Sequence, residues 1–560
     1  MSNSRKFKIG FLLLIGCFGA TSEIYPSHLQ RVVSDIKPRF LNNLKEVSRV
    51  AKLPNGKLIA VFTRNNGSAP ELVGRYSSDN GQTWSEVQSL TPLPKDESGW
   101  SSPEPLVDQG GELQIFFLKS RKKQLSGLDI DIWHTKSTNG RTNWRVPRRI
   151  WEGYTGSLNS VIQMRNGRIL LPFSYMTKRT WAKRGEGFDA FTYMGTFNCT
   201  VLYSDDQGDT WQLSPDELKV TAPDLSTYGA IEPVVVERKD GQVWMLLRTQ
   251  HGRFYESLSK DGITWSKPRP TRIFSSDSPA GLVRLGDGRI VMFWNNCLRF
   301  PYAYGGRHVL HGAITSDDGK SWRGFREVAH NPRRDEPPPP TGDHGATYPI
   351  PCAVADGCII TSTGLPTNYN LFVDPKWFYE TKQREDFTQG LENWSAFGTK
   401  GVELSIHPDK QNARVLSLRK TELDWPAAAV WNFPSGTKGS LHLRILIKPG
   451  FEGVRIGVTD HFSVPFDDLD EFHNLYNVAI NSEGKIGKTK LTPNRWHTVQ
   501  LKWDIEQRRC RVLVNGHEVT VLIQSRETLG ANYLRLISTA ETTDLAGLLL
   551  EEVEANIIPN

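Results

Sequence analysis

Two polar side chains stand at matching points of otherwise apolar stretches of the sequence. Glu232 lies in the stretch 229–234 and Tyr348 in the stretch 345–349, and each precedes the glycine of a tight-turn motif by nine residues. A phenol close to a carboxylate has a base to accept its proton, so it can act as a nucleophile despite an intrinsic pKa near about 10. The two residues therefore predict covalent catalysis by a tyrosine, provided that the fold brings their strands together.

Six tight turns supply the positions from which this match is measured. Asn-Gly or Asp-Gly between alternating apolar residues is the strongest short-range signal for a β-hairpin. The turns occupy residues 54–57, 109–112, 165–168, 239–242, 286–289 and 355–358. Val47, Ser102, Leu158, Glu232 and Tyr348 lie nine positions before their glycines, and Ser278 lies ten positions before Gly288. Because the flanking apolar runs lack helical periodicity, we predict short strands joined in hairpins.

A second, independent repeat is an octad that runs Ser-x-Asp-x-Gly-x-Thr-Trp. It occupies Ser77–Trp84, Ser204–Trp211 and Thr315–Trp322, with a shorter copy at Ser259–Trp265 and a blurred one at Ser137–Trp144. Asp caps its own turn, Gly adopts a positive φ, and Trp packs the turn onto a neighbouring sheet. Internal repeats of this kind indicate a repeated architecture, and we assign the octads a structural role.

Hairpins interleaved with octads predict repeated antiparallel sheets of about four strands. Closing six such sheets into a ring removes their exposed edges, which gives a six-bladed β-propeller over residues 23–380. An extended stack of sheets is the alternative. We expect the last sheet, which has no octad, to be completed by a strand from the lead-in 25–43.

The sequence pattern changes from Glu385 onward, where no further octads occur. Residues 496–503 and 510–514 alternate between apolar and polar, and the second run turns at Asn515-Gly516. This pattern predicts a β-sandwich for residues 385–560, and it resembles laminin-G or legume-lectin-type jelly rolls. Such domains bind glycans or act as structural companions, and both roles remain open here. The whole chain is thus predicted to be all-β.

The first 22 residues predict an export signal, because a basic start is followed by the apolar run 9–15 and small residues. Cys17 lies in a lipoprotein-like box, which predicts a possible membrane tether through a lipidated Cys17; ordinary cleavage near residues 20–22 is the alternative. We therefore expect an exported protein that is periplasmic, attached to the cell surface or extracellular.

The composition excludes several classes of function. The chain has 560 residues, of which 38% are hydrophobic and 23% charged, as in an ordered globular protein. Its net charge is +7, and three of the positive charges lie in the export signal. No basic stretch is interleaved with aromatic residues, so we expect no nucleic-acid partner. The cysteines lack metal-ligand spacing, so they predict no metal site. We expect no other cofactor either.

Octads on a six-bladed ring, together with a Glu and a late Tyr, resemble the sialidase (neuraminidase) family of glycoside hydrolases over about residues 40–380. The resemblance implies that Tyr348 is the nucleophile and that Glu232 activates it. It also implies an Asp as acid/base and three arginines that clamp the substrate carboxylate. Arg248 matches the second clamp arginine and Arg307 the third, and the planar guanidinium suits bidentate binding of a carboxylate.

Two positions depart from the family pattern. Arg49 is the nearest candidate for the first clamp arginine, but it is displaced by about three residues, and an odd shift turns a strand residue to the other face. Asp96 is the candidate acid/base, with Glu97 and Glu104 as rivals.

The sequence therefore predicts a secreted retaining exo-glycosidase, most simply an exo-α-sialidase acting on sialylated or other acidic glycans. One alternative is a glycosidase or lyase for another acidic polysaccharide, such as one built from uronic acids. The other alternative is a non-catalytic glycan-binding surface protein.

Overall fold

The computed structural model describes residues 36–559, apart from 42–43, 45, 47, 66–69, 95–98, 122–129, 139–142, 179–194, 222–227, 299–305, 331–344 and 366–368. The described residues form β-strands and loops, with only the short 3-10 segments η2 (Pro375–Tyr379) and η3 (Asp468–His473) as helices. The prediction of an all-β chain is therefore confirmed.

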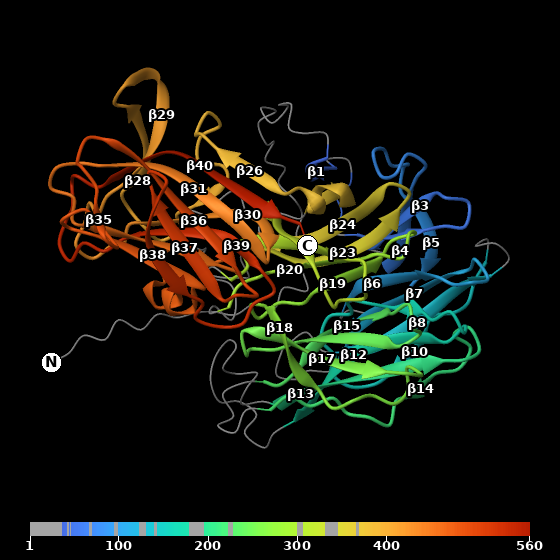
Figure 1. Ribbon diagram of the computed structural model, residues 1–560. Helices are drawn as coiled ribbons and strands as arrows, with labels where there is room; N and C mark the ends of the chain where they lie inside the picture. The colour runs from blue at the N-terminus through green and yellow to red at the C-terminus, as the bar shows by residue number, and fades with distance from the viewer. Residues whose placement is uncertain are drawn as a thin grey trace, which may run out of the picture. The chain divides into compact units, whose positions relative to one another are not determined.

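The chain divides into two compact units, which are described separately. The first comprises Met1–Thr271, Asp277–Asn295 and Pro339–Pro375, and the second comprises Arg272–Ser276, Asn296–Pro338 and Lys376–Asn560. Both are coloured along the chain in Figure 1.

The first unit is a series of small antiparallel sheets whose strands mostly follow chain order. One sheet contains β2 (Arg49–Lys52), β3 (Leu58–Asn65), β4 (Pro70–Ser77) and β5 (Gln88–Pro92). The next contains β6 (Trp100–Val107), β7 (Leu113–Ser120), β8 (Ile130–Thr138) and β10 (Arg148–Trp151), with β9 (Asn143–Trp144) on β8. A third contains β11 (Ile162–Gln163), β12 (Ile169–Lys178), β13 (Gly195–Ser204) and β14 (Gln212–Leu213).

Three further groups of strands follow along the chain. The strands β15 (Ile231–Glu237), β16 (Val243–Arg248) and β17 (Arg253–Ser259) are neighbours in one sheet, and β18 (Arg269–Phe274) spans the boundary of the two units. The strands β19 (Gly281–Arg284) and β20 (Ile290–Trp294) pair antiparallel. The last sheet has the order β1-β25-β24-β23, from β1 (Arg39–Phe40), β25 (Tyr369–Val373), β24 (Gly357–Leu365) and β23 (Gly345–Val354).

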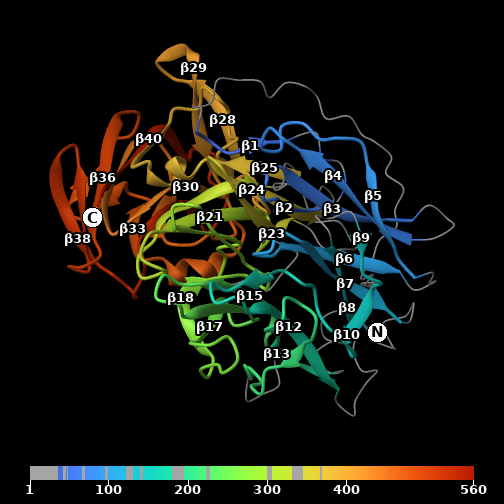
Figure 2. The same ribbon diagram turned by 90° about the vertical axis from the view of Figure 1, so that its right-hand side faces the viewer.

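This last sheet joins the two ends of the first unit, because its outer strand β1 comes from the lead-in. Arg39 pairs with Phe372 and Phe40 with Leu371, so the expectation that the lead-in supplies a strand is confirmed. Figure 2 shows β1 beside β25 and β24. Main-chain pairing therefore joins β1 to β25, which lies more than 300 residues further along the sequence.

The six predicted turns all connect strands, and their chemistry is the one that the sequence implies. In four of them the Asn or Asp side chain accepts a hydrogen bond from the main chain two residues on, as in Lys57 N to Asn55 Oδ1 at 3.1 Å. The glycine that follows has a positive φ, for example 82° at Gly56 and 94° at Gly167. Each turn therefore fixes where the first strand of its hairpin ends and where the second begins.

Strands near the start of each sheet pack against one another. The first strands in contact are β2 with β6, β15 with β19, β19 with β23, and β23 with β2, and β12, the second strand of its sheet, packs against β15. Apolar side chains fill the space between neighbouring sheets; one cluster joins Ile59 and Val61 to Ile115 and Phe117. Residues at corresponding points of these first strands consequently lie near a common region.

The octads form the turns that their composition predicts. In the second copy, Ser204 Oγ donates to Asp206 Oδ1 at 2.8 Å, and Asp206 accepts from the main-chain N–H of Thr210 at 2.8 Å and from its hydroxyl at 2.5 Å. Gly208 has a φ of 87°. Partial burial alone raises the pKa of Asp206, but the hydrogen bonds from Thr210 and Ser204 outweigh it and lower the pKa to about 2.

This shift predicts acid sensitivity of the octads. Because the folded-state pKa of Asp206 lies below the unfolded value of about 3.9, its stabilising contribution is present above pH 4 and is lost as the pH falls toward 2. We expect the Asp206→Asn variant to lose less stability than the wild type between pH 5 and pH 2.5, as measured by urea unfolding midpoints. Equal losses in the two proteins would contradict this assignment.

The second unit contains a strand pair joined by an octad, and two larger sheets. The strands β21 (Val309–Thr315) and β22 (Arg323–His330) flank the third octad and pair antiparallel. One larger sheet has the order β28-β29-β40-β31-β36-β37-β38, with β26 on β40; the other has the order β27-β30-β39-β32-β33. The bounds are β26 (Lys382–Glu385), β27 (Trp394–Ser395), β28 (Val402–His407), β29 (Lys410–Leu418), β30 (Ala428–Gly436), β31 (Lys438–Ile447), β32 (Gly453–Thr459), β33 (Tyr476–Asn481), β36 (Trp496–Asp504), β37 (Arg509–Val514), β38 (His517–Ile523), β39 (Ala531–Ser538) and β40 (Leu548–Ile558), and the two-stranded ribbon β34 (Lys485–Ile486) and β35 (Thr489–Lys490) completes the unit.

One apolar core lies between these two larger sheets. Trp394 and Trp431 from one sheet and Trp503 from the other belong to it, and all three are almost fully buried. The predicted alternating strands are β36 and β37, and the turn after β37 has positive φ at Asn515 and Gly516. Every second residue of β36 is buried, which is why its alternating sequence pattern predicted a strand.

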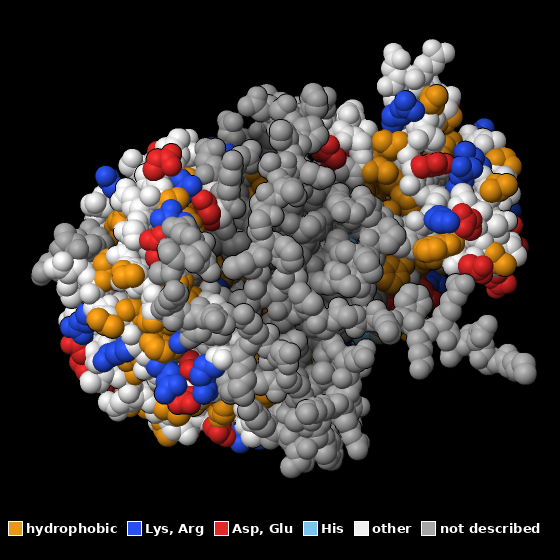
Figure 3. All heavy atoms as spheres, turned by 180° about the vertical axis from the view of Figure 1, so that it is seen from behind, with side chains coloured by type: hydrophobic (Ala, Val, Ile, Leu, Met, Phe, Trp, Pro, Cys, Tyr) orange, Lys and Arg blue, Asp and Glu red, His pale blue; other side chains and the backbone are white. Residues whose placement is uncertain are grey.

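The described residues contain no helix long and apolar enough to cross a membrane, and no group of three or more His, Cys, Asp or Glu arranged to hold a metal ion. The five described cysteines are free, and four of them are buried. On the described part of the face seen in Figure 3, Lys and Arg side chains alternate with Asp and Glu side chains. The export signal and Cys17 lie outside the described residues.

Candidate active site

Glu232 and Tyr348 occupy the same strained backbone position in two different sheets. Both have a φ of 51°, which is rare for residues other than glycine, and each is followed by a proline. Pro233 and Pro349 have no N–H to donate, and the ladder register shifts at both places, between Ile231 and Val234 and between Thr347 and Pro349. Such bulges re-aim a side chain, and strained positions of this kind cluster at active sites.

The two side chains meet through Arg248. The Tyr348 hydroxyl lies 3.5 Å from Glu232 Oε1. Arg248 Nη1 donates to Glu232 Oε2 at 2.5 Å and to the Tyr348 hydroxyl at 3.0 Å. Arg248 is the last residue of β16 and pairs with Ile231, directly before Glu232. The structure thus brings three of the predicted site residues into one hydrogen-bonded group.

The other edge of Arg248 is held by Asp277, which the sequence did not single out. Arg248 Nε donates to Asp277 Oδ1 at 2.6 Å, and the Tyr228 hydroxyl donates to the same carboxylate oxygen. Burial by itself lowers the pKa of Arg248, but Asp277 and then Glu232 outweigh it and hold that pKa well above its usual value. Asp277 therefore fixes the guanidinium in place. Its one sequence signal is that it precedes Ser278, which lies ten positions before a turn glycine.

Arg49, the candidate first clamp arginine, also approaches this group. Its Nη1 contacts the carboxylate of Glu104 and the main-chain carbonyl of Leu158. Burial lowers the pKa of Arg49 to about 9, and the carboxylate of Glu232 raises it, so Arg49 lies within electrostatic reach of Glu232 and stays charged at neutral pH. The displacement of Arg49 in the sequence has therefore not turned it away from the site.

Arg307 and the acid/base candidates are not part of the hydrogen-bonded group of Tyr348, Glu232 and Arg248 as the structure describes it. Arg307 belongs to the second unit, two residues before β21, and is fully buried. Asp96 and Glu97 lie outside the described residues. Of the three carboxylates that the sequence offered for the acid/base role, Glu104 is described, and it is paired with Arg49.

The group can activate a phenol. Glu232 is the base beside the Tyr348 hydroxyl, and Arg248 Nη1 is a fixed cation next to the oxygen on which negative charge would develop. A separation of 3.5 Å is long for proton transfer, but catalytic hydrogen bonds often tighten only when substrate is bound. The phenol of Tyr154, by contrast, has a raised pKa because of burial and then because of Glu232 and Tyr348, which favours its neutral form.

The described charges of the group do not balance. Three carboxylates (Glu104, Glu232 and Asp277) accompany two guanidiniums (Arg49 and Arg248), which sums to one negative charge when all are ionised. An anionic substrate would therefore require a further cation at this site.

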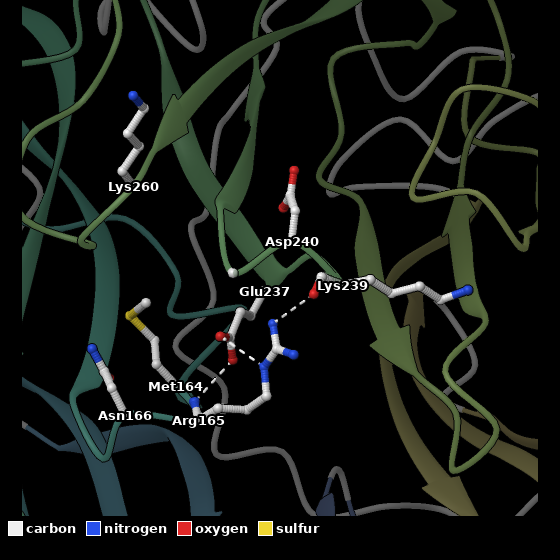
Figure 4. A pocket seen from close by; sticks show the side chains of 8 residues that line it. Met164, Arg165, Asn166, Glu237, Lys239, Asp240 and Lys260 are labelled. Atoms are coloured by element: carbon white, nitrogen blue, oxygen red, sulfur yellow. Dashed lines mark hydrogen bonds and ion pairs between the residues drawn. The ribbon is translucent and has the colours of Figure 1, made fainter.

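A separate hollow of about 480 Å³ lies at the hairpin turns of the first unit and is lined by Met164, Arg165, Asn166, Glu237, Lys239, Asp240, Gly241 and Lys260. Figure 4 shows Arg165 lying across it: its Nε donates to Glu237 Oε1 at 3.0 Å and its Nη2 to the carbonyl of Lys239 at 3.2 Å. Glu237 ends β15, whereas Glu232 lies near its start, which separates the two places by roughly 17 Å at about 3.3 Å per residue. The hollow is therefore distinct from the group around Arg248, and two of its charged side chains, Arg165 and Glu237, are paired with each other.

Comparisons with known proteins bear on the repeats. A family model described as a BNR repeat-like domain matches residues 95–360, and one described as a BNR/Asp-box repeat matches residues 75–86, which contain the first octad. A sialidase from Micromonospora viridifaciens is 26% identical over 314 residues, which is 48% of this chain and 44% of that protein. The chain therefore contains BNR repeats, and the matches support a sialidase-type family. It covers less than half the length of that relative.

Solved structures of low identity resemble the chain. A Trypanosoma rangeli sialidase in complex with sialic acid has a TM-score of 0.38 and 14% identity, covering 94% of this chain and 95% of that one. A protein of unknown function from Dyadobacter fermentans has a TM-score of 0.43 and 16% identity, covering 60% of this chain and 98% of that one.

Proposed function

We propose that the chain is a retaining exo-glycosidase that releases terminal sialic acids from glycoconjugates. The observation that carries the proposal is the contact of the half-buried Tyr348 with the buried Glu232 and Arg248 in one hydrogen-bonded group. A tyrosine beside a base is the arrangement that sialidases use in place of the two carboxylates of most glycosidases. The sialidase relative supports the same assignment.

In the proposed reaction, the Tyr348 oxygen attacks the anomeric carbon while its proton passes to Glu232. The glycosidic bond breaks, and the leaving alcohol takes a proton from a general acid. Water then attacks the anomeric carbon of the tyrosyl glycoside and gives a proton to the deprotonated general acid, while the bond to Tyr348 breaks and the phenol regains its proton from Glu232. Arg248 stabilises the phenolate each time that it forms, because a fixed cation at a site shielded from water needs no reorganisation.

The finer features of the fold belong to the same proposal. The packing of the early strands of one sheet against those of another supports a six-bladed propeller in which the sheet of β19 and β20 is one blade. Two sheets around a single core support a β-sandwich of the laminin-G or lectin type for residues 385–560. Export, with or without a lipid on Cys17, would place the enzyme where sialylated glycans are found.

Asp96 is the proposed general acid, because Glu104 is already paired with Arg49. We expect Asp96→Asn to lower kcat/KM on sialyllactose by about 100-fold or more, since general acid catalysis contributes about 10²–10⁴-fold. On an aryl sialoside, whose phenolate leaves without protonation, the loss should be much smaller. Glu104→Gln is the matched variant. If its loss of kcat/KM on sialyllactose exceeds its loss on the aryl sialoside by a larger factor than for Asp96→Asn, the role of general acid belongs to Glu104.

Release of free sialic acid from sialyllactose by the full chain tests the proposal directly. The second candidate is a glycosidase or lyase for another acidic sugar, which the pairing of Arg49 with Glu104 favours because it leaves fewer guanidiniums for a carboxylate clamp. Turnover of uronic-acid oligosaccharides without turnover of sialosides would select that candidate. Binding of sialosides without turnover would indicate a glycan-binding protein instead.

A further inference from the structure

Three residues of the first unit share one unusual backbone conformation. Ser102, Glu232 and Tyr348 all have a φ of 51°, and each is followed by a proline. Positive φ costs a residue other than glycine of the order of 1–3 kcal/mol, and such strain persists only where the surrounding structure imposes it. Glycine would adopt this conformation without strain, yet three different polar side chains occupy it.

The three residues also occupy equivalent places in three sheets. Each precedes the glycine of its hairpin turn by nine residues and lies where the register of the first and second strands shifts. For Ser102 the shift falls between Ser101 and Glu104, on β6 and β7. A bulge takes one residue out of the ladder and re-aims its side chain, so the three bulges present their side chains in corresponding ways.

The surroundings of Ser102 border the candidate active site. Glu104, two residues further along β6, pairs with Arg49, and Arg49 is within electrostatic reach of Glu232. The strand β6 packs against β2, which carries Arg49. Ser102 itself is half-buried, and within the described part of the chain its hydroxyl has no hydrogen-bond partner.

We infer that Ser102 is a substrate-binding residue of this site, whose hydroxyl hydrogen-bonds to a hydroxyl group of the bound sugar. The inference rests on the proposed function, and it adds a residue that the resemblance to sialidases did not supply. Two of the three equivalent positions hold the nucleophile and its base, so the third holds a polar group at the same level of the site. A serine hydroxyl both donates and accepts, which suits a polyhydroxylated ligand.

Two substitutions test the inference through different consequences. Ser102→Ala removes the hydroxyl and keeps the strain, and it should lower kcat/KM on sialyllactose by about 2- to 12-fold, the value of one neutral hydrogen bond, mainly through a higher KM. Ser102→Gly removes the hydroxyl and the strain together, so it should show the same loss of kcat/KM with an unchanged or higher melting temperature. Ser101→Ala, at the neighbouring serine, is the control and should retain the wild-type kcat/KM.

The outcomes separate this inference from the proposed function. A wild type that cleaves sialyllactose, together with a Ser102→Ala variant of unchanged kcat/KM and KM, would overturn the role of Ser102 alone. A wild type that cleaves no sialoside would overturn the proposed function. In that case calorimetric titration with free N-acetylneuraminic acid decides: weaker binding by Ser102→Ala than by the wild type supports the inference, and equal binding or no binding by the wild type overturns it.

Discussion

The Tyr348→Phe variant is expected to retain its fold and to lose at least about 10³-fold in kcat/KM on sialosides, because it lacks the oxygen that forms the covalent intermediate. Phenylalanine keeps the ring over which Arg248 lies, with the guanidinium carbon 6.0 Å from the ring centroid. Steady-state kinetics with a fluorogenic sialoside measures the loss, and circular dichroism checks the fold.

Tyr203→Phe is the matched control for this loss. Its hydroxyl donates to Gln212 Oε1 at 2.9 Å in the outer strands β13 and β14, so its removal deletes a phenol hydrogen bond of the first unit without touching the group around Arg248. We expect kcat/KM of this control to stay within about twofold of the wild-type value, since this hydroxyl is outside the candidate site and one hydrogen bond contributes only modestly to stability. A Tyr348→Phe variant as active as this control would remove the nucleophile from the proposal.

Replacing Arg248 by Leu should destabilise the protein by about 3–5 kcal/mol, because it leaves two buried carboxylates without their cation. Glu232 and Asp277 would then face each other's charge at a place where the side chains of Arg248, Glu232 and Asp277 are at most 6% exposed. Urea unfolding followed by tryptophan fluorescence measures the change, with the transition of the first unit analysed separately.

Arg165→Leu provides the contrast for this measurement. Its ion pair with Glu237 is similar in geometry, at 3.0 Å, but the Arg165 side chain is 62% exposed. Exposed pairs contribute about 0–1 kcal/mol, so this variant should unfold close to the wild type. Similar losses for the two variants would show that the burial of Arg248 does not carry the energetic role assigned to it.

The sequence predicted the part of the site that lies within its repeats. The hairpin glycines provide a fixed distance along each first strand, and Glu232 and Tyr348 stand at that distance in two sheets. Arg248 follows because it ends the second strand of the same hairpin and pairs beside Glu232. These three residues were accessible because turn chemistry sets strand register, and register sets which positions correspond.

The remaining contacts depend on packing between segments that are distant in sequence, so the sequence alone did not predict them. Asp277 lies in the loop before β19, outside every motif, and only the fold brings it to Arg248. The pairing of Arg49 with Glu104 joins two sheets and likewise has no local signal. Strand order in the second unit, where β40 lies between β29 and β31, is equally non-local.

Trapping of the covalent intermediate tests the central claim most directly. The full chain would be incubated with 2,3-difluorosialic acid, whose fluorine substituents slow hydrolysis of a glycosyl-enzyme, and then digested and analysed by tandem mass spectrometry. The account predicts one glycosyl adduct, on the peptide that contains Tyr348 and on its phenolic oxygen, and no adduct in Tyr348→Phe. An adduct on another residue, or none in a protein that still hydrolyses sialosides with retention, would contradict it.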